Sequence, residues 1–442
     1  MLPDGTLYIL ALNGVICLSG VLLCVLVMIR ERRLLLMPMG LAFFLVTNGL
    51  TQGAPLWIDL GVNFPTDPII YQRATAIDAI ILTIALPCLF ILGCTSPGSE
   101  APDRPLGIAL LAVITAFAAG ASGYFLIRNW EVLPLVERLY STSNYYEYIN
   151  LRNQIGDVIN GHSLSGTAPA SWAHGVWCPF LFWTVPDQKR INRGLRLVWL
   201  GIIAAAMWVP AVIVGSRLML LLAVAIPLLA FVSRRFNLRH VVRHWAGAWR
   251  PLLGALGLTV AGAYVFQYFY HGTFLESLVD LGARALGAPA AVSGCYYYAF
   301  PEYFPFRGWL GILKFPMVGD SVDFHLVSLA ATGLDSNANG SFAATAYSGA
   351  GFAGVAVAAA VVFVFATWLD GKLRRLPRRL ANAVGFSNVI PASVLGSAPA
   401  LTAMATFGFL LGPLVIVVLL TMFRDIPPWR PAETPRNPPL SS

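Results

Sequence analysis

The chain has 442 residues, of which 57% are apolar and only 11% are charged, and its formal net charge is +8. Soluble proteins carry roughly 25% charged residues, so this composition excludes a soluble globular protein. It also excludes a disordered chain, because disordered sequences are polar and rich in charge. Apolar runs long enough to cross a bilayer core of about 30 Å recur from end to end. The composition therefore predicts an all-α, polytopic membrane protein.

Hydropathy predicts a single transmembrane domain, residues 1–423, followed by a Pro-rich, disordered cytoplasmic tail, residues 424–442. Two connections on the same side of the membrane are long, at about 128–169 and 271–341, and we expect them to contain short interfacial helices. Eleven spans are expected, at about 7–29, 34–58, 74–94, 106–127, 170–186, 197–214, 217–232, 251–270, 342–368, 387–403 and 405–423.

The basic residues follow this predicted topology. With eleven spans, 21 of the 29 Lys and Arg residues fall on one side of the membrane. The positive-inside rule then places the N-terminus outside and the C-terminus in the cytoplasm. The net charge reflects topology and does not indicate nucleic-acid binding. Because the outer connections are the long ones, we expect any chemistry on the outer face.

No cofactor or metal motif is present in the sequence. It contains no GxxxxGK[ST] phosphate-binding loop. Its six cysteines show no spacing typical of a zinc site. We therefore expect neither a cofactor nor a metal ion.

Arg217 is the first candidate for chemistry. Residues 198–232 are apolar except at Gly215, Ser216 and Arg217. One helix of that length would exceed 50 Å at about 1.5 Å per residue, so the chain must turn near Gly215. The turn then lies at the outer headgroup level, where a guanidinium either binds a lipid phosphate or only anchors the helix at the interface.

The second candidate region begins at residue 296 with YYYAFPEYFPFRGWLGILKFP. Aromatic side chains of this density either bind sugar rings or mark a membrane interface. Its Pro and Gly residues exclude one long helix, so we expect a structured loop or short helices on the membrane. The next stretch supplies four titratable side chains, each of which is a general base or a solvated loop residue: Asp320, Asp323, His325 and Asp335.

Arg73 lies near the outer start of the third predicted span and is a plausible second phosphate contact. The alternative is a structural pair with Asp78, about one helical turn away.

Three stretches of the sequence resemble the O-antigen polymerase group, which polymerises oligosaccharide repeat units of bacterial surface polysaccharides. GSRLMLLL at 215–222 resembles the family's turn, in which two small residues precede an Arg and aliphatic residues follow it. PEYFPFRGWLGIL at 301–313 resembles a segment rich in Pro, aromatic residues and Gly. NANGSFAATAYSGAGFAG at 337–354 resembles the start of a late span in the family.

The resemblance implies a GT-C-like, metal-independent glycosyltransferase in the bacterial inner membrane. It would transfer a glycan from undecaprenyl diphosphate to an acceptor repeat unit at the periplasmic face, in lipopolysaccharide or exopolysaccharide synthesis. The expected partners are the undecaprenyl-diphosphate-linked oligosaccharide, membrane lipids and a chain-length regulator protein.

The resemblance also suggests roles for particular residues. Arg217 and Arg307 would stabilise the lipid diphosphate leaving group. An acidic residue, Asp320, Asp323 or Glu302, would take the proton from the acceptor hydroxyl. The residues expected to bind substrate are Arg73, Lys314, Tyr298, Trp309, His325, Asn339 and Tyr347.

Three alternatives remain open. O-antigen ligases typically carry a His just before the Asn of the third stretch, whereas here Ala338 precedes Asn339, and His325 lies well upstream. This favours a polymerase. A flippase or other transporter of lipid-linked saccharides would need polar residues along a path through the bundle, and several predicted spans have almost none at mid-depth. The last alternative is a structural component of a polysaccharide-export machine.

Overall fold

A computed structural model covers the whole chain and describes residues 5–53, 64–95, 106–142, 145–161, 167–214, 222–230, 287–309, 324–333 and 340–422, with a few isolated positions between them. Every regular element in these ranges is a helix. The predicted helical class is thereby confirmed.

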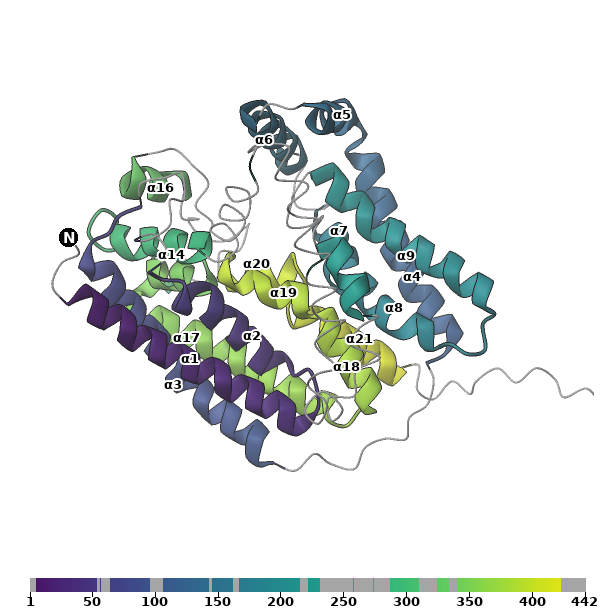
Figure 1. Cartoon of the computed structure of the whole chain (residues 1–442), viewed down its shortest axis with the longest axis horizontal. Coiled ribbons are helices and arrows are strands. Elements are labelled where there is room, and N and C mark those ends of the chain that lie inside the picture. The colour runs from purple at the N-terminus through teal and green to yellow at the C-terminus, as the bar shows by residue number, and fades with distance from the viewer. Residues whose placement is uncertain are drawn as a thin grey trace, which may run out of the picture.

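Figure 1 shows two groups of helices, each built around long helices, with a group of shorter helices between them. The first group contains α1 (Thr6–Glu31), α2 (Leu36–Phe44), α3 (Pro68–Cys94), α14 (Ala288–Ala299), α16 (Phe324–Thr332) and α17 (Phe342–Leu373). The second contains α4 (Ile108–Arg128), α7 (Thr167–Trp172), α8 (Cys178–Thr184) and α9 (Arg193–Val214). Between them lie α18 (Arg378–Ser387), α19 (Val389–Ser393), α20 (Ala400–Ala405) and α21 (Leu411–Met422).

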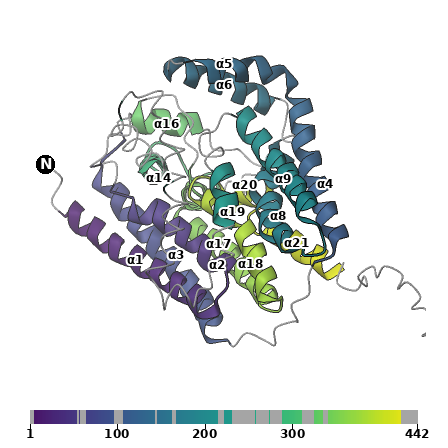
Figure 2. The same ribbon diagram turned by 45° about the vertical axis from the view of Figure 1, so that its right-hand side comes forward.

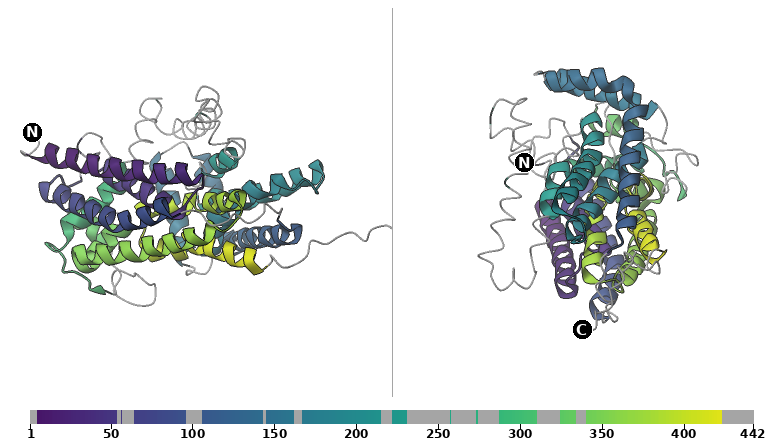
Figure 3. Two further views of the ribbon diagram at one scale, coloured as in Figure 1. Left: turned by 90° about the horizontal axis from the view of Figure 1, so that it is seen from below. Right: turned by 90° about the vertical axis from the view of Figure 1, so that its right-hand side faces the viewer.

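The longest helices of the first group pack side by side. In Figure 3, α1, α3 and α17 run nearly parallel to one another, and α3 contacts both of the others. Figure 2 shows α5 (Leu133–Ser141) and α6 (Tyr145–Gly161) lying across one end of α4. This is the end of the bundle at which α1 begins, and we refer to it as the predicted outer end.

Five of the described helices are long and apolar enough to cross a membrane: α1, α3, α4, α9 and α17. Their exposed surfaces are apolar too, as Leu12, Val15 and Leu26 of α1 illustrate. A helix that exposes such a surface along its length is suited to lipid and not to water. The chain is therefore a helical membrane protein.

The other predicted spans correspond to shorter or interrupted helices. Predicted span 34–58 is α2 followed by a π-helical turn, η1 (Leu45–Leu50). Predicted span 170–186 is α7 and α8 joined by a second π-helical turn, η4 (Ala173–Trp177). Residues 387–403 form short pieces, because Pro391 and Pro399 interrupt the helical hydrogen bonds. Predicted span 251–270 lies outside the described residues except at Gly257.

Helix α3 begins at Pro68, six residues before the predicted start at 74. The Asp67 side chain accepts a hydrogen bond from the backbone N–H of Ile69, and Pro68 occupies the first helical position. Both are typical of a helix start. Asp78 consequently lies about 15 Å along the helix at 1.5 Å per residue, deeper than its sequence position suggested.

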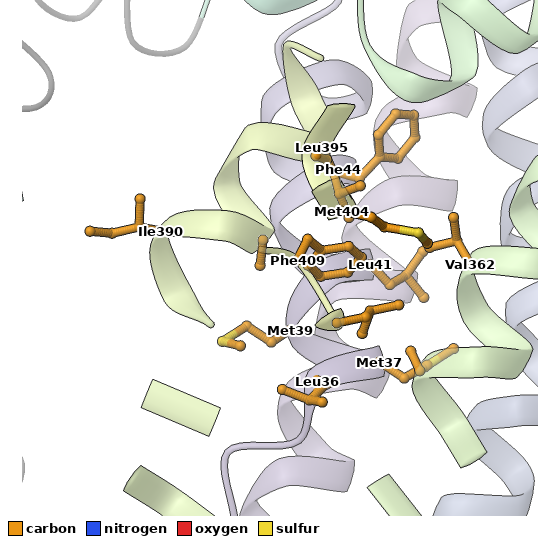
Figure 4. Close-up of a cluster of buried hydrophobic side chains, with 14 of the residues drawn as sticks. Leu36, Met37, Met39, Leu41, Phe44, Val362, Ile390, Leu395, Met404 and Phe409 are labelled. Atoms are coloured by element: carbon orange, nitrogen blue, oxygen red, sulfur yellow. The ribbon is translucent and has the colours of Figure 1, made fainter. Parts of the chain in front are cut away.

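Buried apolar side chains join α2 to α17 and to the C-terminal helices. Figure 4 shows that Met37, Met39 and Phe44 of α2 belong to one buried cluster with Val362 of α17 and Phe409 before α21. Gly40 allows this close approach, because a Cβ there would lie 3.1 Å from the Phe409 ring. This cluster fixes the helices that carry the candidate site.

The opposite end of the bundle is held together by buried polar contacts. The Asp370 carboxylate of α17 accepts hydrogen bonds from the first backbone N–H groups of α2, Leu36 at 2.7 Å and Met37 at 2.9 Å. Arg374 pairs with Glu31 at 3.0 Å. These contacts join α1, α2 and α17 at the end of the bundle that carries the clusters of basic residues within the described ranges.

Candidate functional site

The aromatic segment predicted to carry function lies at the predicted outer end, between α14 and α17. Helix α14 ends at Ala299, where Pro301 and Pro305 prevent its continuation. The buried Phe300 ring anchors the segment, since it packs 6.4 Å from the Tyr296 ring and 5.7 Å from the Phe304 ring. The segment therefore leaves α14 in a fixed direction.

Arg73 of α3 ties the end of α14 to this segment. Its Nη1 donates to the carbonyl oxygens of Tyr297 at 2.6 Å and Phe300 at 2.9 Å. These are carbonyls of the last helical turn, which lack a partner within the helix and attract a cation. Both terminal nitrogens also bind the Glu302 carboxylate, with Nη1 at 2.8 Å from Oε2. Arg73 pairs with Glu302 and not with Asp78.

This ion pair stabilises the ionised form of Glu302. The hydrogen bonds from Arg73 hold the pKa of the Glu302 carboxyl below its usual range. Glu302 is exposed, so water screens the pair and its energetic contribution is small. At neutral pH the arrangement presents an ionised carboxylate whose lone pairs are partly occupied by Arg73.

Arg307 is held against a break in α17. Its backbone N–H donates to the Ser348 carbonyl at 3.0 Å, and the N–H of Gly308 donates to the Gly349 carbonyl at 2.8 Å. Helix α17 loses helical geometry at Ala350 and Gly351, where Gly351 has φ 60°. A positive φ favours glycine, and a Cβ there would also lie 3.2 Å from the Phe306 ring.

The side chain of Arg307 has an unused donor. Its Nε is buried and, among the described residues, has no hydrogen-bond partner. A buried guanidinium N–H without an acceptor is costly, typically about 1–3 kcal/mol or more for a charged group. The position is therefore suited to an anion that supplies the missing acceptor.

The aromatic side chains near Arg307 in the sequence and at the start of α17 fall into a buried group and an exposed group. Tyr347 is buried, and its ring packs 5.5 Å from Tyr297, 5.8 Å from Phe306 and 5.3 Å from Phe352. Tyr303 and Trp309 are exposed by 55% and 57%, and we refer to the exposed aromatic side chains of the segment as the outer layer.

Tyr298 completes the outer layer. Its hydroxyl lies 2.7 Å from the hydroxyl of Tyr303, and the two rings are 5.2 Å apart. The structure thus brings six predicted site residues to one end of the bundle: Arg73, Tyr298, Glu302, Arg307, Trp309 and Tyr347. His325 is exposed on α16, a helix that packs against α14. The remaining predicted site residues lie outside the described residues: Arg217, Lys314, Asp320, Asp323 and Asn339.

Sequence reasoning missed a buried hydrogen-bonded chain below the aromatic segment. The Ser293 hydroxyl of α14 lies 2.7 Å from Asn48 Oδ1 of η1 and 3.0 Å from the Ser341 hydroxyl. Ser341 also caps α17 by accepting from the N–H of Ala344. The available signal was weak, because only Ser293 is an isolated polar residue in an apolar stretch, whereas Asn48 and Ser341 have other polar residues close by in the sequence. This chain fixes the start of α17 relative to α14.

Within the described ranges, no three His, Cys, Asp or Glu side chains gather closely enough to bind a metal ion. Comparisons with protein-family models, with curated proteins and with solved structures found no match to this chain.

Proposed function

We propose that this protein polymerises undecaprenyl-diphosphate-linked oligosaccharide repeat units at the periplasmic face of the bacterial inner membrane, without a metal ion. The complete chain would cross the membrane eleven times in a GT-C-like arrangement. The observation that carries the proposal is the buried Nε of Arg307, which has no partner among the described residues and belongs to a segment with exposed aromatic side chains. The resemblance of 215–222, 301–313 and 337–354 to the O-antigen polymerase group supports the same activity.

The proposed reaction requires a group that stabilises a diphosphate. The acceptor hydroxyl oxygen attacks the anomeric carbon of the donor sugar, and the bond from that carbon to the diphosphate oxygen breaks. Negative charge then accumulates on the departing lipid diphosphate. A guanidinium binds phosphate oxygens through two parallel hydrogen bonds, which makes Arg307 suited to this step. Arg217 would supply a second cation.

The outer aromatic layer suits the sugars of the two substrates. The exposed rings of Tyr303 and Trp309 offer apolar faces, and the paired hydroxyls of Tyr298 and Tyr303 offer polar edges. Sugar rings are bound by surfaces that combine both.

The proton of the acceptor hydroxyl must pass to a base. Glu302 accepts it only after leaving Arg73, because its lone pairs are partly occupied by that guanidinium. Arg73 therefore holds Glu302 and the end of α14 in place and does not act mainly as a phosphate ligand. Asp320 and Asp323 are the other candidates for the base.

A flippase for lipid-linked saccharides is the second candidate. The observation that favours it is the group of polar side chains buried inside α1 and α3, Asn13 and Asp78, because polar groups at membrane depth often mark transport paths. An O-antigen ligase would use the same donor chemistry with a different acceptor.

The test compares Arg307→Ala with Arg138→Ala in cells that make a matching repeat unit. Arg138 is an exposed residue of α5 at the same predicted outer end, where it pairs with Glu147 at 3.4 Å. We expect Arg307→Ala to abolish long chains, so that single capped units accumulate, while Arg138→Ala preserves the chain-length ladder. Both variants must be present in the membrane at equal levels.

A purified assay separates the candidates. In detergent there are no two compartments, so a flippase yields no product, whereas a polymerase extends lipid-linked repeat units. A normal ladder from Arg307→Ala, or no elongation by the purified wild-type protein, would refute the proposal.

A further inference from the structure

One side of α17 is exposed from its middle to its end, and this exposed stripe finishes in two cations. Its exposed side chains recur every three or four residues, which places them on one side of the helix. The turn continues past the last helical residue, because the backbone N–H of Arg375 donates to the Lys372 carbonyl oxygen at 3.1 Å. The exposed side chains of the stripe are Val357, Val361, Val364, Trp368, Lys372 and Arg375.

The apolar part of the stripe has the depth of one leaflet. Val361, Val364 and Trp368 are 60%, 59% and 49% exposed. At about 1.5 Å per residue, Val361 lies about 16 Å from Lys372 along the helix axis. This is about half of a bilayer core of about 30 Å. An acyl chain that packs along the stripe from Val361 therefore reaches the headgroup level near Lys372.

Open space lies between the aromatic ring and the cations. The Trp368 ring stacks on the Phe365 ring at 5.6 Å, and Lys372 Nζ lies 5.5 Å from the centre of the Trp368 ring. This cation–π contact holds the ammonium group close to the ring. Gly371 lies on the same side of the helix, and a Cβ built there would meet no heavy atom within 4 Å. A headgroup can therefore approach the helix backbone at Gly371.

The positive charge at this end of the stripe is not neutralised by the described part of the chain. Neither Lys372 nor Arg375 has an acidic partner among the described residues. The acidic side chains of α1 and α17 at this end are Glu31 and Asp370, and both are buried. Glu31 pairs with Arg374, and Asp370 accepts from the start of α2. The stripe therefore offers two exposed cations to an anion.

We propose that this stripe binds one phospholipid with an anionic headgroup. Its phosphate lies between Lys372 and Arg375 over Gly371, and its acyl chains pack on Trp368, Val364 and Val361. A free phosphate would use only the cations, whereas a lipid uses the cations and the apolar stripe together. Trp and Lys also mark membrane interfaces without selecting a lipid, and the open space at Gly371 distinguishes a binding site from such an anchor. The site is independent of the polymerase activity.

Native mass spectrometry of the purified full-length protein tests this proposal, because it counts bound lipids by their mass. The protein in detergent is titrated with phosphatidylglycerol, which is anionic, and with phosphatidylcholine of the same acyl chains, which has no net charge. We expect the wild type to bind one phosphatidylglycerol in preference to phosphatidylcholine. The double variant Lys372→Gln, Arg375→Gln should bind phosphatidylglycerol about thirtyfold more weakly, since each basic residue near an anionic lipid contributes about fivefold.

Two further variants separate a site from overall charge. Lys189→Gln with Arg190→Gln removes two exposed cations from the connection between α8 and α9, away from α17, and should keep the preference for phosphatidylglycerol. Gly371→Leu fills the open space without changing any charge and should lose the preference. Melting temperatures in detergent alone verify that each variant is folded.

Three outcomes would overturn the proposal. The first is equal binding of the two lipids by the wild type. The second is an equal loss of preference in both double variants, which would show that only the overall charge acts. The third is wild-type binding of phosphatidylglycerol by Gly371→Leu. Glycerol 3-phosphate serves as the soluble probe, and binding as tight as that of phosphatidylglycerol would assign the cations to a free phosphate and not to a lipid.

Discussion

Asp370 provides a sharp test of how the helices are joined at the predicted cytoplasmic end. Its two oxygens accept from two different backbone N–H groups, those of Leu36 and Met37. Asp370→Asn leaves one oxygen, so one buried N–H loses its acceptor and faces an NH₂ group. A buried unsatisfied donor costs about 1–3 kcal/mol. Loss of a negative charge at the N-terminus of α2 adds about 0.3–2 kcal/mol. We therefore expect Asp370→Asn to lower the free energy of unfolding by about 1–5 kcal/mol.

Asp67→Asn is the matched control. Asp67 also caps a helix, but it is exposed, and its Oδ1 accepts a single hydrogen bond, from the backbone N–H of Ile69. Asn caps helices about as well as Asp, so we expect a loss below about 1 kcal/mol. Reversible unfolding in mixed micelles, driven by sodium dodecyl sulfate and followed by the fluorescence of the 12 tryptophans, measures both. Equal losses in the two variants would refute the reasoning that both oxygens of Asp370 are required.

Two further changes follow from contacts at other positions. Gly385→Ala should lower the free energy of unfolding by about 1–3 kcal/mol, because the new Cβ would lie 2.7 Å from Leu34 Cβ and closer still to its carbonyl oxygen. Gly371 has open space around it, so Gly371→Ala should instead raise the free energy of unfolding by about 0.5–1 kcal/mol in the same titration. If Gly371→Ala destabilised the protein more than Gly385→Ala, this account of the packing would be wrong. The pair of Glu302 with Arg73 should stabilise the protein above the ordinary Glu pKa of 4.5, and this contribution should vanish as the pH falls through the lowered folded-state pKa. Melting temperatures of the wild type and Glu302→Gln should therefore converge in acid; a constant difference down to pH 2 would refute it.

The sequence predicted the long uninterrupted helices well because length and hydropathy define them directly. The predicted span 106–127 is α4, Ile108–Arg128, and the predicted span 7–29 is α1, Thr6–Glu31. Prediction failed at the start of α3, because Asp67 and Pro68 lie before the apolar run that a hydropathy window detects. The capping signal was in the sequence, and it places Asp78 in the interior of the helix.

The candidate site was predicted as a set of residues, and its pairings were not predictable. Arg73 and Glu302 were chosen for separate roles, yet 229 positions in sequence separate them and they bind each other. Only the packing of α14 against α3 brings them together. The unpartnered Nε of Arg307 likewise depends on the break in α17, which Gly351 permits but does not by itself specify.

Three of the helix interruptions share one physical feature. Each of the three contains a buried polar side chain that binds a backbone group elsewhere. Asn48 in η1 donates to the Gly396 carbonyl at 3.2 Å. In η4, His174 lies 3.1 Å from the Met207 carbonyl.

A third interruption follows the same rule. Asn388, between α18 and α19, accepts from the N–H of Leu410 at 3.4 Å. Irregular backbone at membrane depth is tolerated only where protein surrounds it and supplies hydrogen bonds. The interrupted helices are therefore the ones that require neighbours. This agrees with the burial of nearly every residue of α2 and α8, whereas the long helices α1 and α4 expose apolar faces suited to lipid.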